Sequence, residues 1–244
     1  MRIDATTGAK PESTKNDIED HVTDPPESQI TISIFLGILV VTAFLMPSIG
    51  FGNSEWLYSN IVFALLIGTG IIIAWRQRGL FIVSALIGAI ALSLRCLALL
   101  APSTLWQFAS EVATLLAIFA IMAILSLRIL FRKGLITAVS IQAAIAIYLL
   151  FGLAWANAYL IVIQLNPHSF QSALSLSSTS VSGWYYYSYV TLTTLGYGDI
   201  IPLAKVSRSL AVGEALTGQL YLAVLVARLI SMEITAYSTK NSKS

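Results

Sequence analysis

Residues 183–202 read Gly-Trp-Tyr-Tyr-Tyr-Ser-Tyr-Val-Thr-Leu-Thr-Thr-Leu-Gly-Tyr-Gly-Asp-Ile-Ile-Pro. The aromatic part is too short to cross a membrane, and two glycines that flank a tyrosine follow it. Apolar segments long enough to cross lie on both sides. Non-helical backbone at membrane depth is tolerated only where protein buries it or where it lines a watery path. The pattern therefore predicts a re-entrant half-helix over about 184–193, followed by an extended loop.

The composition is that of a membrane protein. Of the 244 residues, 57% are hydrophobic and 11% are charged, whereas soluble domains carry about 25% charged residues. The chain has 14 basic and 12 acidic side chains, and ten of these 26 lie in residues 1–28. A net charge of +2 without a basic cluster excludes nucleic acid as a partner. The single Cys96 excludes an internal disulfide and, with two histidines, a zinc cluster.

Six apolar segments follow a polar stretch over residues 1–29, which we expect to be a disordered cytoplasmic tail. The runs are continuous rather than alternating, which favours helices over a barrel. The expected fold class is an all-α membrane protein with six transmembrane helices. The expected re-entrant helix and loop lie between helices five and six. The segments are 30–51, 57–75, 80–100, 107–131, 135–165 and 206–233, forming a four-helix membrane domain over 30–133 and a second domain over 134–233, with a short tail over 234–244.

Basic residues in two of the loops indicate the orientation. They lie between segments two and three and at the junction of four and five, and the positive-inside rule places these loops and both termini in the cytoplasm. A multi-pass cell-membrane protein is expected, and the compact loops suit a prokaryotic inner membrane. The residues are Arg76, Arg78, Arg128, Arg132 and Lys133, while Lys205 and Arg208 fall on the outer side as an exception.

The stretch Thr-Thr-Leu-Gly-Tyr-Gly-Asp at 193–199 resembles the selectivity-filter signature of the potassium-channel family, with Leu195 where the family usually has valine. The resemblance covers about residues 135–233. It implies that backbone carbonyls replace the water shell of a potassium ion, and that the Thr194 hydroxyl adds the innermost ligands. The implied ion-binding residues are Thr194, Leu195, Gly196, Tyr197 and Gly198, and no further cofactor is expected.

Residues next to this loop are expected to support it. Gly196 and Gly198 fit a strand whose carbonyls all point to one axis, because such a strand needs residues that adopt positive φ. Tyr197 is expected to point away from the axis and to pack on an aromatic cuff made by Trp184, Tyr185, Tyr186 or Tyr187. Asp199 is expected to anchor the outer end of the loop through Tyr186. The half-helix would aim its partly negative C-terminus at a central cavity.

The last apolar segment carries further candidates. An acid in a membrane helix is a functional candidate by default, and Glu214 is expected to hydrogen-bond behind the filter, to Thr191 or Thr193, or to enrich cations near the cavity. The alternative is a structural acid paired with Lys205 or Arg208. By resemblance, Gly218 lies where family members have a hinge glycine, although close packing is equally plausible, and Gln219, Leu222 and Val226 would line the cavity.

The resemblance implies a homotetramer in a lipid bilayer, because one chain supplies only one filter strand. No catalytic constellation and no Gly-rich phosphate loop point to an enzyme. The alternatives are a weakly selective cation channel, a subunit of a potassium uptake transporter, and a non-conducting regulatory or scaffold subunit.

The first four segments lack the arginine spacing of a voltage sensor, which leaves their role open. Arg95 and Glu111 lie at similar depth in segments three and four. They are expected either to form an ion pair or to extend separately to the headgroups.

Overall fold

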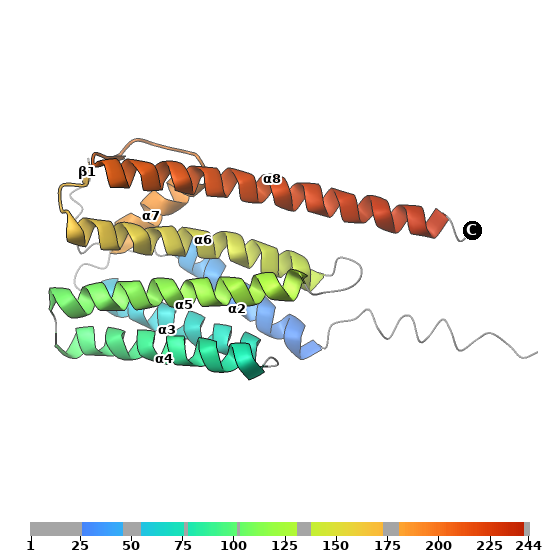
Figure 1. The fold of residues 1–244 in the computed structure, drawn as a ribbon, viewed down its shortest axis with the longest axis horizontal. Coiled ribbons are helices and arrows are strands. Elements are labelled where there is room, and N and C mark those ends of the chain that lie inside the picture. The colour runs from blue at the N-terminus through green and yellow to red at the C-terminus, as the bar shows by residue number, and fades with distance from the viewer. Residues whose placement is uncertain are drawn as a thin grey trace, which may run out of the picture.

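The computed structural model describes residues 26–45, 55–75, 78–101, 103–130, 138–172 and 181–241. The long helices lie side by side with roughly parallel axes, and α8 reaches beyond the others toward the C-terminus (Figure 1). The short α7 lies between α6 and α8. In chain order the helices are α2 (Pro26–Leu45), α3 (Glu55–Ala74), α4 (Arg78–Leu100), α5 (Thr104–Leu130), α6 (Ala138–Leu165), α7 (Val181–Leu192) and α8 (Lys205–Asn241).

The helix boundaries differ from the predicted ones mainly at the two ends of the chain. α2 begins at Pro26 rather than at residue 30, because the fixed φ of proline suits the first helical turn and its missing N–H is not needed there. α8 continues to Asn241, so most of the predicted tail over 234–244 is helical. The predicted disorder over 1–25 lies outside the described residues.

Within the described residues, four helical stretches are long and apolar enough to cross a membrane. They are Phe81–Leu100, Thr104–Leu127, Ala138–Leu165 and Lys205–Ser231. The apolar parts of α2 and α3, Gln29–Leu45 and Tyr58–Ala74, are shorter. The number of six crossings therefore stays a prediction.

Helix α6 is the centre of the packing, since it contacts α2, α5, α7 and α8. Its buried face contains five alanines, which let neighbouring backbones approach closely. Large apolar side chains such as Phe35, Leu39, Leu125 and Leu153 fill the space around it. The two predicted domains thus share one hydrophobic core, and α7 packs against it.

Two short strands, which the sequence did not indicate, tie the chain before α7 to the chain after the glycine-containing loop. β1 (Phe170–Ser172) pairs antiparallel with β2 (Ile200–Pro202). Next to them, the Ser169 carbonyl accepts hydrogen bonds from the Leu203 backbone N–H at 2.8 Å and from the Ser207 hydroxyl at 2.8 Å. The end of β1 and the chain that follows the loop are therefore joined to each other beside the N-terminus of α8.

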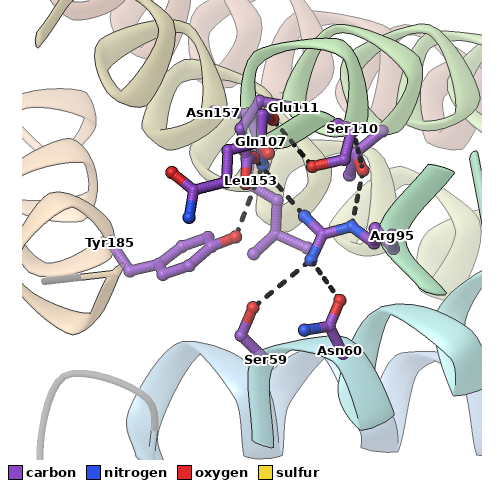
Figure 2. A network of polar contacts seen from close by, with 10 residues as sticks. Ser59, Asn60, Arg95, Gln107, Ser110, Glu111, Leu153, Asn157 and Tyr185 are labelled. Carbon is purple, nitrogen blue, oxygen red and sulfur yellow. Dashed lines mark hydrogen bonds and ion pairs between the residues drawn. The ribbon is translucent and has the colours of Figure 1, made fainter. Parts of the chain in front are cut away.

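A buried arginine joins three of the first four helices. Arg95 on α4 is 3% exposed, and its Nη2 lies 3.4 Å from Oε2 of Glu111 on α5. Its Nε donates to Thr114 Oγ1 at 2.7 Å, and its Nη1 donates to Asn60 Oδ1 at 3.0 Å and to Ser59 Oγ at 3.4 Å on α3 (Figure 2). The predicted ion pair is confirmed, and separate extension to the headgroups is wrong. We call these five residues the Arg95 cluster.

Candidate functional site

Helix α7 is held by aromatic side chains that face the core. The Tyr187 ring centroid lies 4.9 Å from that of Tyr159 on α6, and the Trp184 centroid lies 4.8 Å from that of Phe170 on β1. Tyr185 is 1% exposed and packs toward Phe63 of α3. These contacts fix both the position and the rotation of α7 against α6, β1 and α3.

The four aromatic residues named for the cuff around Tyr197 do not all face the loop. Successive residues of a helix point about 100° apart, so a run of aromatics cannot all face one loop. Trp184, Tyr185 and Tyr187 are turned into the core, and Tyr197 stays 66% exposed in the single chain. Tyr186 alone of the four faces the loop, where a side-chain hydrogen bond joins it to Asp199, as predicted.

The C-terminal end of α7 has the hydrogen bonds of a Schellman motif. The Leu195 N–H donates to the Val190 carbonyl at 2.9 Å, and the Thr194 N–H donates to the Thr191 carbonyl at 2.9 Å. Thr194, the first of these two donors after the helix, itself has a φ of 59°. Glycine is usual at this position, and a left-handed conformation costs other residues about 1–2 kcal/mol. Threonine at this position therefore has a conformational cost that glycine would not have.

Beyond the helix end, the sign of φ alternates along the loop. Thr194, Gly196 and Gly198 have φ values of 59°, 55° and 78°, and they are the described residues with positive φ. The positive φ predicted for both glycines is confirmed, and that of Thr194 was not anticipated. A Cβ added at Gly196 or Gly198 would meet no atom within 4 Å, so within the chain it is φ, not space, that requires glycine there.

Glu214 on α8 is fully buried and joins all three helices of this region. Its Oε1 accepts a hydrogen bond from the Ser188 hydroxyl of α7 at 2.5 Å, and its Oε2 accepts one from the Tyr159 hydroxyl of α6 at 2.5 Å. The Ser188 Oγ also lies 2.7 Å from the Gly152 carbonyl. The carboxyl group therefore lies between α6, α7 and α8.

This geometry overturns both expected sets of partners for Glu214. The hydrogen bond predicted to Thr191 or Thr193 is wrong, and so is the alternative pairing with Lys205 or Arg208, because both carboxyl oxygens have other partners. The sequence carries no signal for Tyr159, which lies 55 positions away. Ser188 was visible as a polar residue inside an aromatic stretch, yet it was not singled out.

Helix α8 touches α7 at its C-terminal end. A Cβ added at Gly218 would collide with the backbone carbonyl oxygen of Leu192, so the glycine allows a close approach of the two backbones. The next residue, Gln219, donates from Nε2 to Thr194 Oγ1 at 3.1 Å. Leu222 and Val226 follow at helical spacing and are 42% and 52% exposed.

The comparisons with known proteins agree with this region of the chain. Residues 135–234 match the model of a family described as ion channels. The match runs over α6, α7, the loop and most of α8, and it covers less than half of the chain. No curated protein and no solved structure matches the sequence.

The class that the fold and the site support is therefore an ion channel embedded in a membrane. The family match supports channel function and describes a transporter of ions rather than an enzyme. The apolar helices support a multi-pass arrangement in a lipid bilayer. An oligomeric assembly is consistent with both.

Proposed function

We propose that the chain is one subunit of a homotetrameric, potassium-selective channel through which ions move passively down their electrochemical gradient. The observation that carries the proposal is the loop after α7, where every second residue from Thr194 to Gly198 has positive φ. In an ordinary strand successive carbonyls point in opposite directions. Alternating the sign of φ turns every second peptide plane, so that successive carbonyls point to one side.

Such a row of carbonyl oxygens is suited to a dehydrated potassium ion. In this proposal the ion is held by the carbonyls of Thr194, Leu195, Gly196 and Tyr197, and Gly198 closes the outer end. The Thr194 hydroxyl supplies the innermost ligands. Its place at the end of α7, with the partly negative helix C-terminus behind it, favours a cation at the inner mouth.

Four copies are proposed because a single strand cannot surround an ion. Leu195 is 59% exposed and Tyr197 is 66% exposed in the single chain. One face of α8 is also apolar and uncovered, with Val212, Leu216 and Leu220 all more than half exposed. A loop with free carbonyls is not stable in lipid, and fourfold assembly around it supplies the missing partners. Cytoplasmic termini and a prokaryotic inner membrane stay predictions.

Two sets of contacts are proposed to support the filter. At its outer end Asp199 bonds to Tyr186, and the Asp199 carboxylate also accepts from the Ile200 N–H at 3.1 Å. Behind α7, Glu214 and Tyr187 hold the helix that carries the filter. Glu214 therefore supports the filter through Ser188 and not by touching the loop.

Below the filter, Gln219, Leu222 and Val226 are proposed to line a central cavity. Gln219 contacts Thr194 directly, which sets the depth of the cavity's upper end. Gly218 is assigned to close packing rather than to a hinge, because the Leu192 carbonyl lies where a side chain would begin.

The test is the reversal potential of ionic current through the purified protein in planar bilayers, with potassium on one side and sodium on the other. We expect a value near the potassium equilibrium potential. Gly196→Ala should abolish the current, because alanine resists the φ of 55°. Gly37→Ala on α2 is the matched control, since its added methyl group meets nothing within 4 Å.

The remaining functions correspond to other outcomes of this experiment. Reversal near zero would show a weakly selective cation channel and direct attention to Leu195. Silence over a range of voltage and pH, together with a tetrameric mass in detergent, would favour a non-conducting scaffold. A monomeric mass would contradict the proposed assembly.

A further inference from the structure

The Arg95 cluster is linked to α7 through an aromatic side chain. The guanidinium carbon of Arg95 lies 4.2 Å from the ring centroid of Phe63 on α3. A cation over an aromatic face is attracted by the ring, most strongly when both groups are desolvated. Phe63 is 2% exposed, so this contact is fully inside the protein.

Phe63 also packs toward α7. Its ring centroid lies 6.3 Å from that of Tyr185, with the planes tilted by 40°. The Tyr185 hydroxyl points toward α6, where Asn157 Nδ2 donates to it at 3.4 Å and to the Leu153 carbonyl at 2.7 Å (Figure 2). Both Arg95 and Glu111 lie within electrostatic range of this hydroxyl. Tyr185 is thus held between α3 and α6 beside the cluster.

The cluster itself is built to stay in place. The guanidinium spreads its donors over α3 and α5 from its own helix α4, and a planar fork with several partners has one favoured orientation. Its charge is matched by Glu111, which is 6% exposed. Moving α5 relative to α4 would separate a buried ion pair, which is strongly unfavourable. Moving α3 relative to α4 would leave buried hydrogen-bonding groups unpaired.

We propose that the Arg95 cluster is the anchor of α7: through Phe63 it fixes Tyr185, and it makes the first four helices a rigid support for the filter of the same subunit. The support of the filter rests on the proposed channel function. The link from the Arg95 cluster to Tyr185 does not depend on that function. Arg95 and Phe63 are positioning residues, since neither touches the ion path. The inference gives the first four helices a role other than voltage sensing.

The experiment measures hydrogen exchange of peptides covering residues 181–195 in the full-length protein, purified in detergent. Four variants are compared with the unmodified chain, and one of them combines Phe63→Leu, Arg95→Gln and Glu111→Gln. Phe63→Leu removes the bridge and leaves the ion pair intact. The pair Arg95→Gln with Glu111→Gln removes both charges together and so avoids an unpaired buried charge. Gly88→Ala is the control, because its methyl group would press on Ile67 of α3, 2.6 Å away, and disturb α3–α4 packing outside the cluster.

We expect exchange in 181–195 to rise about tenfold in Phe63→Leu and in the charge-neutral pair, the size expected for one lost charged contact. The triple variant should show no further rise, because the two changes break the same link. Gly88→Ala should leave this peptide unchanged. The anchor is overturned if the variants exchange like the parent chain, or if Gly88→Ala has an equal effect.

A second readout separates the anchor from the channel function. Phe63→Leu should lower the discrimination between potassium and sodium in the reversal potential about threefold, while Phe63→Trp, which retains the aromatic face, should restore it. If the parent chain carries no selective current, the proposed function fails, yet the exchange measurement still decides whether the anchor exists. If exchange rises and selectivity does not change, the filter does not depend on the anchor and the functional half of the inference is wrong.

Discussion

The four-helix region and the filter-bearing region bury an acid in different ways. Glu111 lies against the positive charge of Arg95 at 3.4 Å. Glu214 is bound by two neutral hydroxyls, of Ser188 and Tyr159, both at 2.5 Å. The first acid therefore acts as a charge and the second as a hydrogen-bonding group. The loss of a charge should therefore be costly in the first region and nearly neutral in the second.

Proton counting around Glu214 sharpens this difference. Ser188 has one hydroxyl proton, but two acceptors lie within reach, the Gly152 carbonyl at 2.7 Å and Glu214 Oε1 at 2.5 Å. One further donor would satisfy every group. An amide at position 214 supplies that donor, whereas an amide at position 111 leaves the arginine charge without a counter-charge.

One glycine of the filter-bearing region meets backbone rather than a side chain. Methyl groups added at Gly70 and Gly88 would meet the side chains of Ile121 and Ile67, at 2.7 Å and 2.6 Å. A methyl group at Gly218 would meet the Leu192 backbone. Side chains rotate away from a new neighbour, but a carbonyl at a helix end moves only with its helix. Position 218 is thus the least forgiving of the three.

The largest expected effect comes from the same substitution made in both regions. Glu111→Gln should lower the free energy of unfolding by about 3 kcal/mol, because it leaves Arg95 buried without its partner charge. Glu214→Gln should change it by less than about 1 kcal/mol, since the amide retains both hydrogen bonds. Unfolding by sodium dodecyl sulfate in mixed micelles, followed by circular dichroism, measures both.

The control for this pair replaces both partners of the ion pair by apolar residues. Arg95→Met combined with Glu111→Leu should restore most of the stability lost in Glu111→Gln, because no unpaired charge remains. Equal losses in Glu111→Gln and Glu214→Gln would show that the distinction between the two acids is wrong.

The next effect separates backbone from side-chain contacts. Gly218→Ala should lower the unfolding free energy by about 2 kcal/mol, because overpacking that shifts a backbone is costly. Gly213→Ala, one turn earlier on α8, meets only the edge of Trp155 at 3.3 Å and should be tolerated. Size-exclusion chromatography and thermal unfolding in detergent report the difference. A stable, well-assembled Gly218→Ala protein would favour a hinge over close packing.

A smaller effect is expected from the hydroxyl between α7 and α8. Ser188→Ala leaves one Glu214 oxygen and the Gly152 carbonyl without this donor and should lower the unfolding free energy by about 1.5 kcal/mol. The control is Ser93→Ala on α4, whose hydroxyl bonds only within its own helix, to the Ile90 carbonyl at 2.9 Å. No loss in Ser188→Ala beyond that of Ser93→Ala would exclude a supporting role for this contact.

Much of the fold was accessible from the sequence because hydrophobicity and glycine act locally. The six long helices of the described residues overlap the six apolar runs, although α2 and α8 extend into polar sequence, and the positive φ of Gly196 suits its residue type. The ion pair of Arg95 and Glu111 was one of two expectations, because the base and the acid lie at similar depth, and the sequence did not decide between them. The partners of Glu214 and the β1–β2 pairing were not found, since they join residues far apart whose types are common.

The smallest effect tests the strain at the end of α7. Thr194→Gly should raise the unfolding free energy by about 1 kcal/mol, because glycine adopts the φ of 59° without the Cβ clash. Thr193→Gly is the control: this residue precedes the turn and does not have positive φ, so glycine should destabilise by up to about 1 kcal/mol. At the same time, Thr194→Gly removes the hydroxyl that Gln219 contacts, and it should shift the reversal potential toward that of a less selective pore. A substitution that raises stability and lowers selectivity is the pattern expected where backbone strain serves function. If Thr194→Gly instead destabilises as much as Thr193→Gly, the threonine is held by contacts stronger than its strain.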